Sequence, residues 1–375
     1  MSNLIYFSIS AILGAVFTYF IKKTALKFKI LDLPILSRKI HSSPTPLLGG
    51  AGVYLAFTLT IILFVLIAKP DFNIVPQKFF GAIILGGLIL TIGGILDDKF
   101  NLPPRLSWLF PAAASLIVVL AGIGVGIKFI SNPFGDPISI GSALKIGNWK
   151  LEFSAAIMWL WMMGMIYTTK FLDGLDGLTS GIAVIGGLTM FALSLTEKVN
   201  QPITAGLAVI FAGAFLGFLI YNFYPASIFL GESGSTLAGF GLGILAIILG
   251  AKIATALLVM GIPILDVAWV IVRRVFYRSS PFVGDRKHLH YRLLDIGLTH
   301  RKAVLALYAI SALFGFTAVF LQSLGKLIAL VILLLLMVGI AIAIVIVYKR
   351  QHPHIPDLFD TAEGSKSKVD QITKN

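Results

Sequence analysis

The sequence contains no cysteine in 375 residues, which excludes a disulfide framework, a thiolate nucleophile and a cysteine-ligated metal. Charge is also scarce, because Asp, Glu, Lys and Arg make up 13% of the chain, whereas about a quarter of a soluble domain is charged. Apolar side chains fill the difference, at 57% of the residues with a mean hydropathy of +0.94. This is the composition of a protein that lies within a lipid bilayer.

Long apolar runs define the organisation of the chain. A membrane span needs roughly 20 mostly apolar residues. We predict an all-α polytopic integral membrane protein with about eleven transmembrane helices, one transmembrane domain over residues 1–350 and a polar, disordered tail over 351–375. The predicted spans are centred on residues 3–21, 47–68, 79–96, 106–127, 153–168, 178–196, 203–221, 236–250, 253–272, 303–322 and 327–348.

The distribution of basic residues predicts the orientation. No basic residue precedes the first run, and Lys22 and Lys23 follow it, the reverse of a secretory signal peptide. With the N-terminus outside and the C-terminus cytoplasmic, 22 of the 30 lysines and arginines and all six histidines fall on the inner side. The net charge of +13 is therefore a topology signal and does not indicate nucleic acid as a partner.

Three acidic clusters stand at predicted span ends on the cytoplasmic side. Asp97 and Asp98 close the third span, Asp173 and Asp176 open the sixth, and Glu232 precedes the eighth. Each could be an ordinary solvated acid or a helix cap. Ionisable groups at membrane depth are expensive and usually functional, and three such clusters at one depth would repel one another without a neutralising cation.

Two inner loops are basic and contain histidine. Residues 284–292 include Arg286, His288 and His290, and residues 38–50 include Arg38 and His41. Basic residues just inside a membrane often serve only as topology determinants. Arginine also binds phosphate oxygens in pairs, and histidine can carry a proton, so a diphosphate site is the second interpretation.

With these segments in order, the chain resembles the polyprenyl-phosphate N-acetylhexosamine-1-phosphate transferases, glycosyltransferase family 4, from Arg38 to about Tyr308. That family includes the enzymes that start O-antigen (lipopolysaccharide) and teichoic acid synthesis and the phospho-N-acetylmuramoyl-pentapeptide translocase. The span count and the His-x-His loop are more similar to the N-acetylglucosamine branch.

The resemblance implies a role for each matching residue. Asp97, Asp98 and His290 would be catalytic, and Asp173 and Glu232 would hold Mg²⁺, with Mn²⁺ as an alternative. Asp176 would lie near the uracil or its ribose, and Phe229 beside the nucleotide. The implied substrate-binding residues are Arg38, Lys39, His41, Thr45, Asp176, Gly177, Asn222, Phe229, Arg286 and His288.

The chain also departs from the family pattern. Glu232 stands where Asp is usual, Lys170 stands where Asn is usual, and Tyr291 replaces a third histidine. A lysine and a glutamine expected downstream of the acidic pair appear as Ser107 and Pro111.

The implied reaction transfers N-acetylhexosamine 1-phosphate, with N-acetylglucosamine as the expected sugar, from a UDP-sugar to undecaprenyl or another polyprenyl phosphate and releases UMP. It would occur at the cytoplasmic face of the cell membrane and serve cell wall biogenesis. Open alternatives are the muramoyl-pentapeptide transferase, a secondary transporter using Asp266 and a scaffold protein. Also open are which of Asp97 and Asp98 acts, direct attack against a covalent Asp intermediate, and a homodimer.

Overall fold

The protein is described by a computed structural model that covers residues 2–34, 43–125, 149–250, 253–276 and 288–351, together with 129–130, 132, 136, 138–139 and 143–146. Almost all of its regular structure is helical. The helices are α1 (Asn3–Lys27), α2 (Gly49–Ala68), α3 (Gln77–Phe100), α4 (Pro104–Ser107), α5 (Leu109–Leu120), α6 (Phe153–Leu172), α7 (Leu178–Ser194), α8 (Pro202–Asn222), α9 (Gly231–Ile248), α10 (Ile253–Val259), α11 (Gly261–Phe276), α12 (Leu289–Asp295), α13 (His300–Phe320) and α14 (Ser323–Gln351).

The described helices confirm a polytopic membrane protein. Eight of them are long and apolar enough to cross a bilayer, or nine if one bent pair counts as a span, and the segments 104–120 and 178–194 are shorter apolar helices. Each of the eleven predicted runs falls on one of these elements. A total of eleven requires the bent pair and both shorter segments to cross, and that total stays a prediction.

The predicted ninth span, 253–272, is not one straight helix. α10 and α11 meet at an angle of 82° on either side of Met260. Pro263 has no backbone N–H to donate, so it is accepted in the first turn of a new helix and not in a helix interior. The chain therefore restarts a helix at Gly261, and hydropathy alone could not reveal the change of direction.

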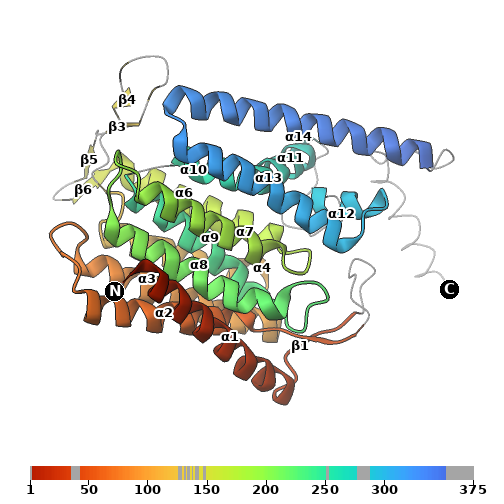
Figure 1. The fold of residues 1–375 in the computed structure, drawn as a ribbon, viewed down its shortest axis with the longest axis horizontal. Helices are drawn as coiled ribbons and strands as arrows, with labels where there is room; N and C mark the ends of the chain where they lie inside the picture. Colours follow the sequence, from red (N-terminus) through yellow and green to blue (C-terminus); the bar gives the residue numbers. More distant parts are fainter. Residues whose placement is uncertain are drawn as a thin grey trace.

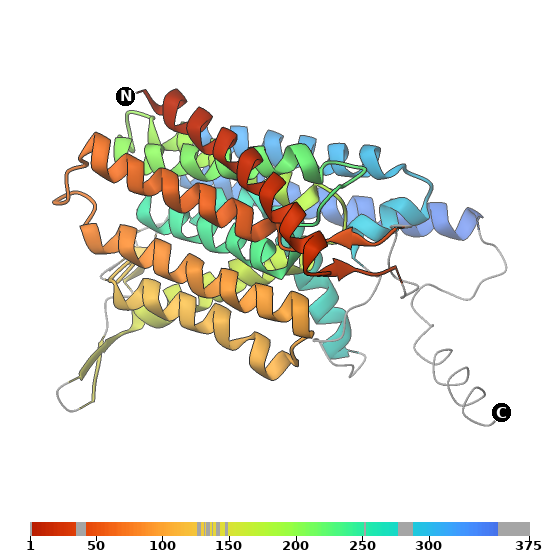
Figure 2. The same ribbon diagram turned by 90° about the horizontal axis from the view of Figure 1, so that it is seen from below.

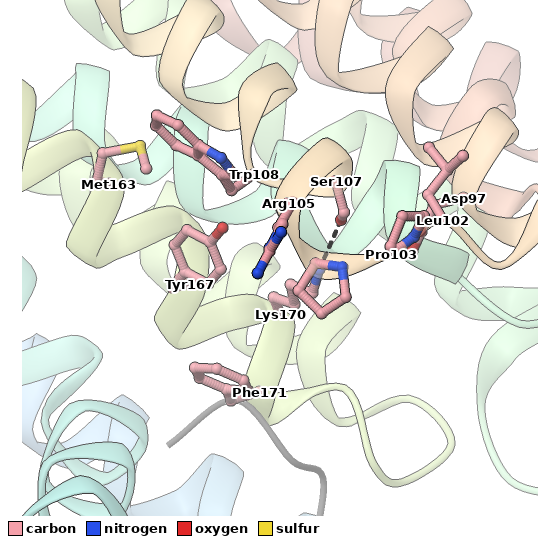
Figure 3. Close-up of a pocket in the computed structure, with 11 residues that line it drawn as sticks. Asp97, Leu102, Pro103, Arg105, Ser107, Trp108, Met163, Tyr167, Lys170 and Phe171 are labelled. Atoms are coloured by element: carbon pink, nitrogen blue, oxygen red, sulfur yellow. Dashed lines mark hydrogen bonds between the residues drawn. The ribbon is translucent and has the colours of Figure 1, made fainter. Parts of the chain in front are cut away.

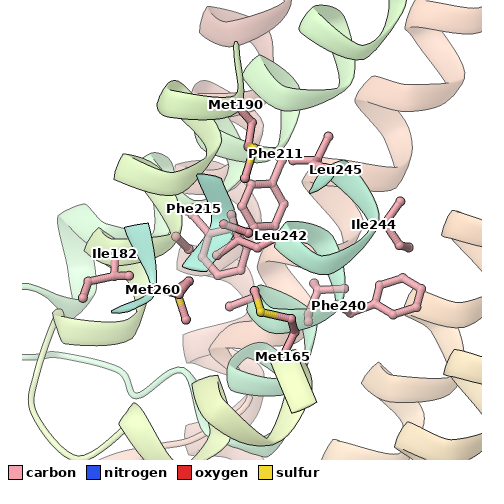
Figure 4. Close-up of a cluster of buried hydrophobic side chains, with 14 of the residues drawn as sticks. Met165, Ile182, Met190, Phe211, Phe215, Phe240, Leu242, Ile244, Leu245 and Met260 are labelled. Atoms are coloured by element: carbon pink, nitrogen blue, oxygen red, sulfur yellow. The ribbon is translucent and has the colours of Figure 1, made fainter. Parts of the chain in front are cut away.

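α8 and α9 form the centre of the bundle. Within the most apolar 18-residue stretch of each helix, 89% of the residues are buried in α9 and 11% in α14, which lies at the edge of the bundle (Figure 1). Small residues allow the central helices to approach closely, as is usual between helices in a membrane. A Cβ added to Gly217 of α8 would lie 2.1 Å from the carbonyl oxygen of Ala11 in α1. Aromatic and methionine side chains fill the space between the central helices, among them Phe211, Phe215, Phe240 and Met165 (Figure 4).

Short antiparallel strand pairs occur at both ends of the bundle. β1 (Leu31–Asp32) pairs with β2 (Thr45–Pro46), β3 (Phe129–Ile130) with β4 (Ile138–Ser139), and β5 (Ala143–Ile146) with β6 (Trp149–Glu152). The N-terminus and β3 to β6 lie at one end, and β1, α12 and the end of α14 lie at the other (Figures 1 and 2). The described parts of the predicted inner loops thus gather at one end of the molecule.

Candidate active site

Asp98, at the end of α3, lies against the N-terminus of α9. Its Oδ1 accepts a hydrogen bond of 3.0 Å from the backbone N–H of Glu232. Gly231 has φ +72°, and a Cβ there would lie 2.4 Å from Oδ2 of Asp98, so this position requires glycine. The positive end of a helix dipole favours an anion at this place. The first and third acidic clusters, far apart in the sequence, are therefore one site.

Two carboxylate oxygens in this site are buried and unpaired. Oδ1 of Asp97 and Oδ2 of Asp98 have no hydrogen-bond partner within the described part of the chain. Burying an unpaired charged oxygen is costly, so such atoms are normally matched by a hydrogen-bond donor or a cation. A bound ligand could supply such a donor or cation to these two oxygens.

Glu232 is held by a lysine from a neighbouring helix. Its Oε1 forms an ion pair with Nζ of Lys170 in α6, and the same Nζ donates a hydrogen bond of 3.3 Å to Oγ of Ser107 in α4 (Figure 3). The two charged side chains are mostly buried, at 24% and 16% exposure. The carboxylate is therefore partly neutralised in the protein alone.

The second acidic cluster lies in the turn between α6 and α7. Burial, together with the charges of Glu232 and Asp176, raises the pKa of Asp173 to about 7. Oδ2 of Asp176 accepts a hydrogen bond of 2.9 Å from the backbone N–H of Ala226, which ties this turn to the loop before α9. Asp173 thus shares the electrostatic environment of Glu232, while Asp176 faces the loop 223–230.

Asn222 fixes this turn from the end of α8. Its Oδ1 accepts hydrogen bonds from the backbone N–H of Gly177, at 3.1 Å, and from Oγ of Ser180, at 2.7 Å. Its Nδ2 donates to the carbonyl oxygen of Ile228 at 3.1 Å. The hydroxyl of Tyr308 in α13 donates to the carbonyl oxygen of Gly177. Asn222, which we predict to bind substrate, therefore links the turn between α6 and α7 to the loop before α9 in this structure.

The histidine loop packs onto the same turn. Nδ1 of His288 lies 2.9 Å from Oδ2 of Asp266, and Oδ1 of Asp266 accepts a hydrogen bond of 2.8 Å from the backbone N–H of Leu289. The rings of His288 and His290 are nearly parallel, with centroids 5.6 Å apart. A Cβ added to Gly174 would lie 2.2 Å from Nε2 of His290, so the glycine leaves room for the imidazole.

His290 is a neutral imidazole at neutral pH. Burial lowers its pKa to about 4, against the opposing charge of Asp266. Its buried Nε2 has no hydrogen-bond partner among the residues described. A neutral ring nitrogen of this kind can exchange a proton or accept a hydrogen bond from a ligand.

The segment before α2 joins the loop before α9 through its backbone. The N–H of Phe229 donates to the carbonyl oxygen of Pro46 at 2.8 Å, and the N–H of Gly49 donates to that of Phe229 at 3.0 Å. Thr45 is buried in β2 opposite Asp32. The predicted residues Arg38, Lys39, His41 and Arg286, like the tail beyond Gln351, lie outside the described residues.

A cavity of about 810 Å³ opens beside the acidic cluster (Figure 3). Its wall combines aromatic and apolar side chains with Lys170, Arg105 and Asp97 at the polar side. The lining residues are Asp97, Leu102, Pro103, Pro104, Arg105, Ser107, Trp108, Met163, Tyr167, Lys170 and Phe171. Such a lining suits a ligand with one anionic group and an apolar part.

The donor chemistry of the cluster fits a hard divalent cation. Mg²⁺ prefers oxygen ligands and is usually held by one or two carboxylates together with phosphates of a substrate. The unpaired oxygens of Asp97 and Asp98 and the neighbouring Asp173 and Glu232 are of this type. Within the described residues no group of three or more acidic or histidine side chains forms a ready metal cage.

Two contacts in this site could not be predicted from sequence motifs. Asp266 lies within a predicted span, towards its inner end, and nothing in the sequence pairs it with His288, 22 residues later. The contact of Lys170 with Glu232 is equally non-local, although both residues stood out as departures from the expected pattern. The sequence signal for this contact was that both residues differ from the family pattern.

Several known proteins have sequences related to this chain. The profile of the family described as "Glycosyl transferase family 4" matches residues 80–250, which include all three acidic clusters. The chain is 29% identical over 323 residues to a probable undecaprenyl-phosphate N-acetylglucosaminyl 1-phosphate transferase of Bacillus subtilis, covering 84% of each protein.

A second relative, the decaprenyl-phosphate N-acetylglucosaminephosphotransferase of Mycolicibacterium smegmatis, is 31% identical over 325 residues, which cover 79% of this chain and 77% of the relative. An undecaprenyl-phosphate alpha-N-acetylglucosaminyl 1-phosphate transferase of Thermotoga maritima is 29% identical over 76% of this chain and 78% of its own length. The chain belongs to glycosyl transferase family 4, the polyprenyl-phosphate N-acetylhexosamine-1-phosphate transferases.

Proposed function

We propose that this protein transfers N-acetylglucosamine 1-phosphate from UDP-N-acetylglucosamine to undecaprenyl phosphate or another polyprenyl phosphate and releases UMP. The observation that carries this proposal is the pair of buried, unpartnered carboxylate oxygens of Asp97 and Asp98, the latter against the N-terminus of α9, in a chain whose relatives are named for this transfer. The product would be the first lipid-linked sugar in the synthesis of a cell-envelope polysaccharide.

The reaction exchanges one phosphoanhydride for another. An oxygen of the lipid phosphate attacks the phosphorus that carries the sugar, the bond from that phosphorus to the bridging oxygen of the diphosphate breaks, and UMP leaves with the electron pair. Phosphoryl transfer depends mainly on positioned charge along the line of attack. Asp97 or Asp98 would take up any proton of the acceptor phosphate and orient it, and His290 would hold or exchange a proton at Nε2.

Binding of the nucleotide sugar would use the loops that meet at Gly177. Asp176 and Phe229 would contact the uridine, and the basic residues Arg38, Lys39, His41, Arg286 and His288 would contact the diphosphate. When bound at Asp173 and Glu232, Mg²⁺ (or Mn²⁺) would neutralise charge on the diphosphate. The neighbouring cavity would admit the phosphate end of the lipid between its aromatic walls.

The direct test incubates the purified protein with UDP-N-acetylglucosamine, undecaprenyl phosphate and Mg²⁺ and measures lipid product and UMP. Release of UDP in place of UMP would identify an ordinary glycosyltransferase and overturn the proposal. Turnover of UDP-muramoyl-pentapeptide alone would establish the alternative sugar. Asp97→Asn is expected to abolish turnover, whereas Asp71→Asn, an exposed carboxylate in the loop before α3, is the matched control that retains it.

The orientation proposed for this protein places the site at the cytoplasmic face of the cell membrane, with the N-terminus outside. The absence of native cysteine allows a clean labelling test. Single cysteines at the exposed positions Ser43 and Asn101 should be protected from an impermeant thiol reagent in intact cells, while Asn73→Cys and Lys198→Cys should react. The reverse pattern would place the site outside. A homodimer stays a prediction that the mass of the purified protein in detergent tests.

Transport coupled through Asp266 is the less favoured function. Both carboxylate oxygens of Asp266 are engaged, one by His288 and one by the backbone of Leu289. A coupling site must bind and release an ion near the midplane. Asp266 instead holds the histidine loop in place.

A further inference from the structure

Three of the residues that depart from the family pattern meet through one side chain, because Lys170 contacts each of the other two. Ser107 stands in α4 where the pattern has a lysine, Lys170 stands in α6 where it has an asparagine, and Glu232 stands in α9 where it has an aspartate. Nζ of Lys170 touches both of the others, through a hydrogen bond of 3.3 Å to Oγ of Ser107 and an ion pair with Oε1 of Glu232. The sequence separates them by as many as 125 positions, so their meeting is a property of the fold.

The ammonium group of Lys170 stands at the border between the acidic cluster and the cavity. Together with Asp97 and Arg105 it lines the 810 Å³ cavity, as Figure 3 shows. Its charge also acts on Asp97, which carries one of the unpaired buried oxygens. A lysine side chain is flexible and presents three donors, so it can exchange one anionic partner for another. Phosphate oxygens entering this cavity would meet Lys170 directly.

We propose, on the basis of the proposed function, that Lys170 is the phosphate-positioning cation of this active site and that it supplies a positive charge from α6 beside Ser107, the position at which the family pattern has a lysine. In the protein alone its ammonium holds Glu232. When substrate enters, the ammonium binds a phosphate oxygen, either of the nucleotide diphosphate or of the lipid phosphate, and Glu232 becomes available to a divalent cation.

The geometry makes the two lysine positions exclusive. The Nζ of Lys170 occupies the space beside Oγ of Ser107, so a lysine added at position 107 would bring a second ammonium group to the same place. Two like charges in a partly buried site repel each other. Moving the lysine should therefore succeed only when Lys170 is removed at the same time.

This reasoning defines a swap experiment on the purified protein. Lys170→Asn should lower kcat/KM by about 100-fold, the usual effect of losing one preorganised electrostatic contact. Ser107→Lys alone should also lower it, whereas the double variant Lys170→Asn/Ser107→Lys should recover to within about tenfold of the wild type because the charge is restored. Lys99→Asn removes the same charge from an exposed position at the end of α3 and should leave kcat/KM unchanged.

Binding measurements identify the phosphate that Lys170 contacts. A tenfold or larger rise in the dissociation constant of UDP, measured by calorimetry with Lys170→Asn and reversed by Ser107→Lys, assigns the nucleotide diphosphate. An unchanged UDP constant with a raised KM for undecaprenyl phosphate assigns the lipid phosphate. If both constants stay at their wild-type values, or if the double variant is no better than Lys170→Asn, the proposal is wrong.

Two further variants separate this role from a structural one. Lys170→Arg keeps the charge and should retain most of the UDP affinity even if Lys170→Asn folds poorly. A structural role would instead give losses that follow the thermal unfolding midpoint and are indifferent to charge at position 107. Wild-type turnover in the same assay tests the proposed function separately, because UDP binding reports on Lys170 even if the lipid product is not formed.

Discussion

Asn222 offers a quantitative test of how the site is assembled. Its amide makes three hydrogen bonds, with Gly177, Ser180 and Ile228, and only 4% of the residue is exposed. Asn222→Ala leaves all three partner groups buried. At roughly 1 kcal/mol for each hydrogen bond, we expect the free energy of unfolding to fall by about 3 kcal/mol. The turn that carries Asp176 would also lose its support, so KM for UDP-N-acetylglucosamine should rise about tenfold.

The assay is SDS-induced unfolding in detergent micelles, followed by tryptophan fluorescence, together with steady-state kinetics. Ser180→Ala removes one of the three bonds and should cost about 1 kcal/mol. Ser10→Ala is the matched control, since it removes a buried hydrogen bond of 2.6 Å to Ile210 in another part of α8. It should cost a similar amount without changing KM. An Asn222→Ala protein no less stable than Ser10→Ala, with unchanged KM, would refute the argument.

Three further predictions concern the acidic cluster and its neighbours. Gly174→Ala should lower kcat/KM about tenfold, because the added Cβ would meet Nε2 of His290. Gly164→Ala, where the structure leaves open space beside α6, is the control and should leave kcat/KM unchanged. Equal rates for the two variants would contradict the close packing of His290 on Gly174. Glu232→Gln should lower the rate about 100-fold, and Glu232→Asp should keep partial activity with a raised Mg²⁺ requirement. A Glu232→Gln variant with an unchanged rate and an unchanged Mg²⁺ dependence would remove Glu232 from the metal site. Asp173, with a pKa of about 7, must lose its proton to bind Mg²⁺, so the Mg²⁺ concentration that gives half of the maximal thermal stabilisation should rise about fivefold between pH 7 and pH 6. Asp173→Asn should abolish that dependence, and a flat response in the unsubstituted protein would exclude Asp173.

The sequence by itself determined the class of protein and predicted which acidic residues the candidate site contains. Apolar runs of fixed length predicted where helices cross the bilayer, because a bilayer demands about 20 apolar residues whatever the fold. The placement of Asp97, Asp98, Asp173 and Glu232 at ends of these runs predicted acids at a common depth. These are local properties, and each can be read from neighbouring residues.

Tertiary structure alone decided which groups meet. Asp98 and the backbone of Glu232 are 134 positions apart, and Lys170 reaches Ser107 and Glu232 on two other helices. The bend at Met260 and the engagement of Asp266 with His288 are likewise results of packing between helices. Hydropathy reports only whether a residue favours an apolar or a polar environment, and it carries no information about which residue it will contact. The chemistry of the site, which depends on those partners, therefore became visible only when the helices were brought together.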